Sequence, residues 1–127
     1  MSAARQAGRR AMQLSTPELE ATILYQVGAL QAMAAAEGGR VTHVKPHGAL
    51  NNIACADAGV AATVARAVRA LDRELILLAP ALSALETAGE AAGLAAVARE
   101  LDICLEEAGA PGVTLCIETT AGQGTNL

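Results

Sequence analysis

Large aromatic side chains are almost missing from this sequence. Tyr25 is its single aromatic residue, and neither phenylalanine nor tryptophan occurs among the 127 residues. Because aromatic rings are the usual large anchors of a core, alanine, valine and leucine have to fill this one, which favours close packing of helices on a sheet. Apolar residues still make up 53% of the chain, which argues against disorder and predicts a single domain over residues 1–127.

Long hydrophobic runs are missing as well. No apolar stretch reaches the ~18 residues that a membrane-spanning helix needs. The first residues include Arg5, Arg9 and Arg10 but no apolar segment typical of a signal peptide. We therefore expect a cytoplasmic protein that does not contact membranes.

Clustered positive charge and paired cysteines are also absent. The formal net charge is −4, whereas a general nucleic-acid-binding surface needs clustered lysine and arginine, so we expect no nucleic-acid partner. Cys55, Cys104 and Cys116 are odd in number and show no CxxC spacing. This predicts reduced, buried thiols rather than a zinc site or a disulfide framework.

A long helix is the first predicted element. Residues 1–13 show no periodicity and are expected to form a mobile arm. Thr16 can cap the helix, and Pro17 suits its first position. Ser15 and Glu18 have the spacing of a capping box. The helix should end at Gly38-Gly39, and its expected apolar face consists of Leu19, Ile23, Val27, Leu30 and Ala34.

Strands and helices alternate along the rest of the chain. Three apolar segments predict strands, at about 40–45, 75–79 and 113–117. The expected helical segments are a short turn at 49–54, a helix capped by Asp57, and one broken helix or two helices over 81–108. The order α-β-α-β-αα-β implies parallel strands joined by helical crossovers. A closed TIM barrel needs about eight strands, so three predict an open α/β TIM-barrel fragment, completed by self-association into a homo-oligomer through its sheet edges.

The segment from Val41 to Leu50 carries the strongest candidate site. A β-branched run stops at Lys45-Pro46-His47-Gly48, and the end of a parallel strand is where chemistry is usually placed. Lys45 and His47 are therefore catalytic candidates, suited to binding an anion or a carboxylate. His43 is expected to be a core or edge histidine, because along an extended chain it lies ~13 Å from His47 and cannot share a metal ion with it.

Three motifs in the first two thirds of the chain carry a family resemblance. They are Gly8-Arg9-Arg10-Ala11-Met12, Tyr25-Gln26-Val27-Gly28-Ala29-Leu30 and Val44-Lys45-Pro46-His47-Gly48-Ala49-Leu50. Together, over about residues 8–90, they resemble the A subunit of 5-oxoprolinase, the LamB/YcsF family. The resemblance implies a TIM-like barrel and, with partner subunits, ATP-dependent opening of 5-oxoproline to glutamate. Asn51 stands where that family usually has tyrosine, and its Asp-Leu-Asn-Cys-Asp-Leu-Gly-Glu and Ala-His-Pro-Gly segments are absent.

The end of the sequence resembles a different family. Residues 93–127, and above all Glu118-Thr119-Thr120-Ala121-Gly122-Gln123-Gly124-Thr125-Asn126, are similar to endonuclease IV, a zinc-dependent abasic-site nuclease with a TIM barrel. That resemblance makes Glu118 the metal candidate. A catalytic zinc site needs about three protein ligands, so Glu118 alone predicts no bound cofactor.

Both resemblances lead to one main hypothesis and two alternatives. We expect a recombined or engineered chimera, joined between about Leu85 and Leu94, that is a non-catalytic, self-associating scaffold. Catalytic groups act as a set, and each parent has lost part of its set. The first alternative is a 5-oxoprolinase component that acts with partner subunits. The second is a remnant of the nuclease that binds zinc.

Overall fold

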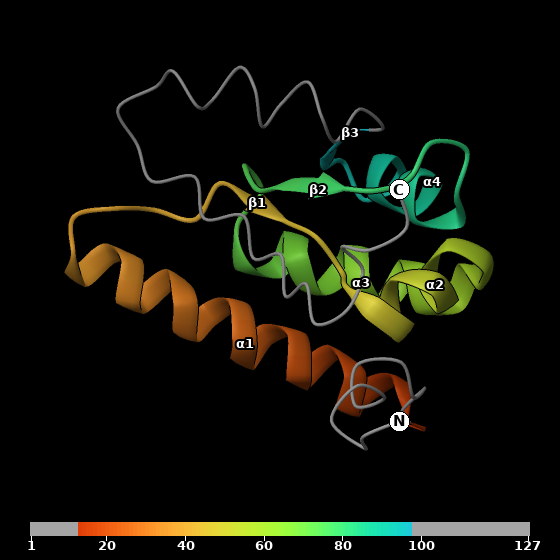
Figure 1. Ribbon diagram of the computed structural model, residues 1–127, viewed down its shortest axis with the longest axis horizontal. Coiled ribbons are helices and arrows are strands. Elements are labelled where there is room, and N and C mark those ends of the chain that lie inside the picture. Colours follow the sequence, from red (N-terminus) through yellow and green to blue (C-terminus); the bar gives the residue numbers. More distant parts are fainter. Residues whose placement is uncertain (1–12, 98–127) are drawn as a thin grey trace, which may run out of the picture.

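The computed structural model describes residues 13–97 of the chain. Its elements are α1 (Thr16–Ala36), β1 (His43–Val44), α2 (Gly48–Ala56), α3 (Ala58–Leu71), β2 (Ile76–Leu78), α4 (Ala84–Ala91) and β3 (Ala95–Val97). The strands form one parallel sheet in the order β1-β2-β3 (Figure 1). The predicted α/β class with three parallel strands is confirmed. None of the helices in residues 13–97 has the length and apolar character to cross a membrane.

Two predicted helix starts are confirmed by their hydrogen bonds. The Glu18 carboxylate accepts hydrogen bonds from the Ser15 backbone N–H at 2.8 Å and from the Ser15 hydroxyl at 2.6 Å. Ser15 is therefore the N-cap of α1 and Thr16 is its first helical residue, so the cap predicted at Thr16 and the first position predicted at Pro17 are each one residue too late. At the start of α3, Asp57 Oδ1 accepts hydrogen bonds from two backbone N–H groups of the first turn, at 2.8 and 3.0 Å. Each cap satisfies N–H groups that the helix itself cannot.

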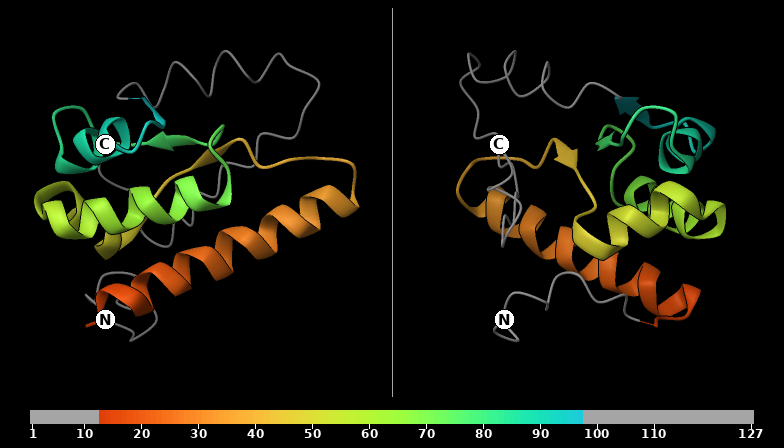
Figure 2. Two further views of the ribbon diagram at one scale, coloured as in Figure 1. Left: turned by 180° about the vertical axis from the view of Figure 1, so that it is seen from behind. Right: turned by 45° about the vertical axis from the view of Figure 1, so that its right-hand side comes forward.

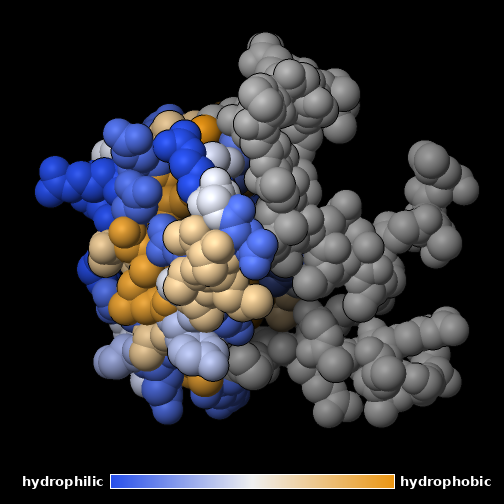
Figure 3. All heavy atoms as spheres, turned by 90° about the vertical axis from the view of Figure 1, so that its left-hand side faces the viewer, coloured by the Kyte–Doolittle hydropathy of each residue, from blue (hydrophilic) through white to orange (hydrophobic). Residues whose placement is uncertain are grey.

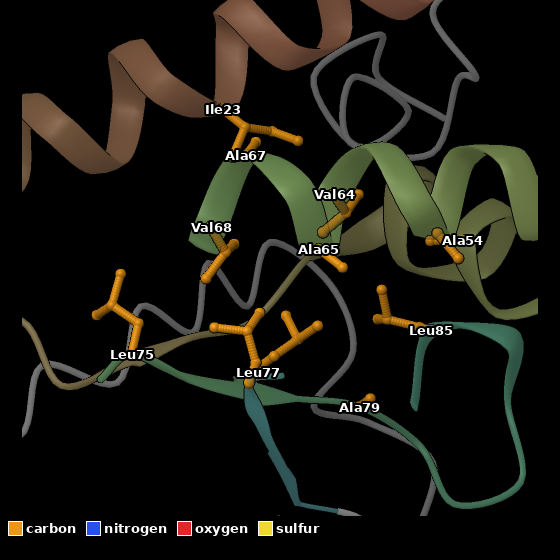
Figure 4. Packing of buried hydrophobic residues seen from close by; sticks show 12 residues of the cluster. Ile23, Ala54, Val64, Ala65, Ala67, Val68, Leu75, Leu77, Ala79 and Leu85 are labelled. Atoms are coloured by element: carbon orange, nitrogen blue, oxygen red, sulfur yellow. The ribbon is translucent and has the colours of Figure 1, made fainter. Parts of the chain in front are cut away.

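The core lies between the sheet and α3. Leu75, Leu77 and Ala79 are at most 1% exposed, and their side chains point toward α3 (Figure 4). Val64 and Val68 of α3 meet them and are equally buried. Burying a leucine or valine side chain stabilises a fold by roughly 1.5–3 kcal/mol. Small aliphatic residues thus hold the sheet on α3 without an aromatic ring.

All four helices lie on one side of the sheet. α4 packs directly on the strands, because a Cβ on Gly89 would come within 3.1 Å of Leu77 Cδ2 and of Ala96 Cβ. Leu77 and Ala96 are partners across β2 and β3, so they share a face. α1 packs on the side of α3 that is turned away from the sheet (Figures 1 and 2). The opposite sheet face, which includes His43 and Ile76, is covered by none of these helices.

Several predicted boundaries are wrong. β1 has two residues, where a strand over 40–45 was expected, and α2 begins at Gly48 and is longer than the predicted turn over 49–54. β3 occupies 95–97, where a helix was predicted. Gly93, with φ +74°, ends α4, and pairing with β2 then draws the short segment Ala95–Val97 into the sheet. Residues 1–12, the rest of the predicted helix to 108 and the strand predicted over 113–117 lie outside the described residues.

Candidate functional site

The turn between β1 and α2 fixes the path of the chain at the predicted site. β1 ends at Val44, and Lys45-Pro46-His47-Gly48 leads straight into α2. Pro46 is buried, whereas Lys45 is exposed. Gly48 has φ +61°, a left-handed conformation that favours glycine. A buried proline and a left-handed glycine leave this turn little freedom, so its side chains have defined places.

The start of α2 has no side-chain cap. His47 is the N-cap residue, with an extended backbone (φ −126°, ψ 155°), and its side chain makes no capping hydrogen bond. The first N–H groups of α2 therefore receive no acceptor from their own N-cap. N–H groups at a helix start attract anions through their partial positive charge.

His43 and Lys45 belong to the sheet face that the helices leave uncovered. His43 is the register partner of Ile76, and alternation along the chain places Lys45 on the same face. The Thr42 hydroxyl lies 2.6 Å from His43 Nδ1, a hydrogen bond that orients the ring. Lys45 is the only lysine in the sequence. The single lysine ammonium of the protein thus lies at the carboxyl end of β1.

The loop between β2 and α4 lies at the same end of the sheet as the Lys45–Gly48 turn, because β1 and β2 are parallel neighbours and each of these segments follows the carboxyl end of its strand. Leu82 in this loop is 98% exposed and has φ +61°. That conformation is strained for a side chain larger than that of glycine. The Glu86 carboxylate holds it by accepting a hydrogen bond from the Leu82 N–H at 2.6 Å. Sequence reasoning missed this residue, since no composition pattern signals a left-handed leucine.

Asn51 is a second residue that sequence reasoning did not place in the site. Its Oδ1 is buried and has no hydrogen-bond partner among the described residues. Asn51 follows His47 by four positions, so the two lie on one side of α2, one turn apart. This four-residue spacing is the sequence signal that could have placed Asn51 beside His47. An amide oxygen in this position can accept a hydrogen bond from a ligand or from another part of the chain.

The structure places Lys45 and His47 together at the carboxyl end of β1, where the sequence puts them, and their roles stay predictions. Within residues 13–97, His, Cys, Asp and Glu side chains form no group of three that could hold a metal ion. Glu118, the metal candidate, lies outside the described residues. The expectations of no cofactor, and of zinc under the alternative, therefore stay untested.

A parallel sheet with helices on one face and a polar turn after a strand defines a piece of an α/β barrel. Comparison with known proteins gives the family. The LamB/YcsF family matches residues 4–102, which is most of the chain. The chain belongs to the LamB/YcsF family.

Individual relatives agree with this assignment. A protein of Azoarcus sp. (strain BH72), named as the A subunit of 5-oxoprolinase, is 58% identical, and the match covers 91% of this chain and 44% of that protein. A protein of the same name from Methylococcus capsulatus is 56% identical over 73% of this chain and 35% of that protein. The crystal structure of the lactam utilization protein from Thermus thermophilus superposes with a TM-score of 0.68 at 46% identity, covering 70% of this chain and 36% of that one. The chain thus spans less than half the length of these relatives.

These matches correct the chimera hypothesis. The family match to residue 102 runs through the junction predicted between Leu85 and Leu94. The Azoarcus relative aligns over 115 of the 127 residues, which leaves only 12 (127 − 115) unmatched, so the alignment continues well into residues 93–127. The prediction of a non-catalytic chimeric scaffold is therefore wrong, and the endonuclease IV resemblance has no support. The predicted self-association into a homo-oligomer stays a prediction. A short run rich in glycine and threonine was too little to identify a family.

Proposed function

We propose that this chain serves a 5-oxoprolinase, which opens the lactam ring of 5-oxoproline to glutamate with ATP and partner subunits. One observation carries the proposal. The Lys45–Gly48 turn follows a parallel strand directly, in a chain whose relatives are named as the A subunit of that enzyme. The name of the Thermus thermophilus protein also refers to lactams, and 5-oxoproline is a cyclic amide that carries a carboxylate.

Lys45 has the chemistry to hold the substrate carboxylate. An ammonium group forms a charge-assisted hydrogen bond with a carboxylate, which is stronger than a neutral one. Lys45 is exposed at the edge of the sheet, so an incoming anion can reach it. The flexible lysine stem also lets the charge follow the substrate as the ring opens.

His47 and the start of α2 have the chemistry for the ring amide. Opening forms a bond from a water oxygen to the carbonyl carbon and breaks the C–N bond, while the leaving nitrogen takes up a proton. Hydrolysis of ATP to ADP and phosphate, which consumes a second water, drives the reaction. Negative charge builds on the carbonyl oxygen, and the uncapped N–H groups of α2 would stabilise it. The imidazole of His47 would deliver the proton to the nitrogen.

The test measures glutamate formed from 5-oxoproline and ATP by the chain mixed with the other 5-oxoprolinase subunits of Azoarcus sp. We expect turnover, and Lys45→Gln should lower kcat/KM by about 10- to 100-fold through the lost charged hydrogen bond. Arg73→Gln is the matched control. Arg73 is also an exposed cation, but it precedes β2 and so lies at the amino ends of the strands, away from Lys45 at their carboxyl ends.

A binding measurement tests whether Lys45 contacts the substrate, independently of turnover. Since Lys45 is the only lysine, acylation of its amine can be followed by mass spectrometry of one peptide. 5-Oxoproline should protect Lys45 from acylation, while glycine at the same concentration should not. No protection together with no turnover would rule the proposal out.

A further inference from the structure

Asn51 carries an acceptor that no group in the described part of the chain satisfies. Its side-chain Oδ1 is buried and has no hydrogen-bond partner among residues 13–97. A buried acceptor without a partner is unfavourable, and native structures contain few of them. Asn51 belongs to α2, which begins directly after the Lys45–Gly48 turn. The unsatisfied oxygen therefore lies close to the turn proposed to bind 5-oxoproline.

The packing of α2 fixes the side of the helix on which Asn51 lies. Leu50 and Ala54 pack with the core, whereas Asn52 is exposed. Asn51 lies between these two sides, one turn after His47, and helical residues at this spacing have Cβ atoms about 5–6 Å apart. Both residues are only partly buried, so a ligand can approach them. An imidazole and an amide oxygen thus stand next to each other on one flank of α2.

The polar side chains at the opposite end of the sheet, where the strands begin, reach water. Asp72, Arg73 and Glu74 precede β2, and all three are exposed. Figure 3 turns this end of the molecule toward the viewer and shows hydrophilic residues around a hydrophobic patch. The buried acceptor of Asn51 belongs instead to the end where the Lys45–Gly48 turn lies.

We infer that Asn51 makes the site specific for a cyclic amide, because its Oδ1 accepts a hydrogen bond from the ring N–H of the substrate. This inference rests on the 5-oxoprolinase proposal and adds a specificity-determining residue to it. In 5-oxoproline the ring nitrogen and the carboxylate are attached to the same carbon. A substrate held by Lys45 through its carboxylate therefore presents its N–H nearby. That N–H supplies the hydrogen bond that Oδ1 lacks.

The same hydrogen bond orients the nitrogen for ring opening. An amide nitrogen carries one hydrogen, and its lone pair becomes a good proton acceptor only after water has added to the carbonyl carbon. With the N–H held by Asn51, the lone pair is directed away from that amide, and the neighbouring imidazole of His47 can protonate it. Asn51 thus binds and orients the substrate, and His47 transfers the proton.

The lactone analogue of 5-oxoproline tests this hydrogen bond, because it keeps the carboxylate and has an oxygen in place of the ring N–H. Protection of Lys45 from acylation, read by mass spectrometry, gives the affinity of the full chain for each compound. We expect the wild-type chain to bind 5-oxoproline about 10- to 100-fold more tightly than the lactone, because the lactone leaves Oδ1 unpaired. The carboxylate is common to both compounds, so its contribution cancels from this ratio of affinities.

Three variants identify the group that sets the ratio. Asn51→Leu removes the acceptor and should reduce the ratio to less than about 3-fold, whereas Asn51→Asp keeps an acceptor, has no N–H donor and should preserve it. Asn52→Leu is the matched control, since Asn52 is the next residue of α2 and is exposed, and it should leave the ratio unchanged. Asn51→Leu should also leave the midpoint of urea unfolding no lower than in the wild type, because it removes an unpaired acceptor and no hydrogen bond within the chain.

The outcomes distinguish this inference from the 5-oxoprolinase proposal. An equal ratio in the wild type and in Asn51→Leu would overturn the inference and leave the proposal standing. A lower unfolding midpoint for Asn51→Leu with an unchanged ratio would overturn it as well, and would assign Oδ1 to a hydrogen bond within the chain. Failure of 5-oxoproline to protect Lys45 would also overturn it, and the proposal would fall too if turnover with the partner subunits were absent.

Discussion

Two turns at the same edge of the sheet share a backbone plan and differ in their side chains. In each, a proline follows the strand, and the residue two positions later has φ +61°: Pro46 and Gly48 after β1, Pro80 and Leu82 after β2. The first turn pairs the left-handed residue with lysine and histidine, whereas the second presents an exposed leucine. The backbone conformation thus belongs to the strand–helix connection, and the chemistry belongs to the side chains placed on it.

The helices that follow these turns also start differently. At α4, Ser83 Oγ accepts a hydrogen bond from the Glu86 N–H at 3.2 Å, and the Glu86 carboxylate accepts one from the Leu82 N–H at 2.6 Å. At α2, the N-cap side chain makes no hydrogen bond to the first turn. The second turn supplies side-chain acceptors to its own N–H groups, whereas the side chain of His47 supplies none to α2. This contrast favours the β1–α2 turn as the ligand site.

The largest change in stability is expected at Gly48, which holds the left-handed position in the first of the two turns. Gly48→Ala should destabilise the fold by about 1–2 kcal/mol, because a Cβ is strained at φ +61°. Gly28→Ala in α1 is the control, since its Cβ would meet only Leu71 Cδ2 at an ordinary 3.6 Å. The control should stabilise by roughly 0.5–1 kcal/mol through helix propensity. Urea unfolding followed by circular dichroism measures both changes, and equal effects would show that φ at Gly48 is not what matters.

The second largest change in stability distinguishes the start of α4 from the start of α2. Ser83→Ala should cost about 1 kcal/mol, because it removes the side-chain acceptor at the start of α4. His47→Ala should change stability by less than about 0.5 kcal/mol, because no capping hydrogen bond is lost at α2. Thermal unfolding of the two variants side by side gives the comparison. A larger loss for His47→Ala would mean that α2 depends on this imidazole for stability.

A smaller effect, of opposite sign, is expected in the second turn. Leu82→Gly should stabilise by roughly 0.5–1 kcal/mol, since relief of the strain exceeds the entropy cost of glycine. Leu82 is 98% exposed, so no burial is lost. Leu82→Ala keeps a Cβ and should bring no gain. If both variants behaved alike in urea unfolding, the left-handed backbone at Leu82 would carry no cost.

Local signals in the sequence predicted some of these features well. The Ser15–Glu18 capping box, the Asp57 cap and the turn at Lys45–Gly48 all follow from residue types within a few positions of one another. β3 was missed because Ala95 and Ala96 favour a helix, and only pairing with β2 makes the segment a strand. Leu82 and Asn51 were missed for a related reason. Backbone angle and burial arise from the folded chain, and neither is a property of a short motif.

The smallest effect concerns a third helix start, that of α1. Hydrogen bonds from the Ser15 hydroxyl and the Ser15 backbone N–H lower the pKa of the Glu18 carboxyl below its ordinary value of about 4.5. A lowered pKa in the folded state means that ionised Glu18 contributes stability above pH ~4.5, and that this contribution is lost as the pH falls through the lowered pKa. Glu18→Gln removes the titration but keeps a side chain that can accept the same hydrogen bonds. The stability difference between the wild-type chain and Glu18→Gln, measured by urea unfolding from pH 7 to pH 3, should therefore shrink toward acid.

Glu20 does not disturb this measurement. The hydrogen bond from Arg66 also lowers the pKa of its carboxyl, but Glu20 is present in both proteins and cancels from the difference. A difference that stayed constant with pH would show that charge on Glu18 adds nothing to its hydrogen bonds. The cap of α1 would then work like the neutral serine cap of α4, because a neutral acceptor would satisfy the same N–H groups equally well.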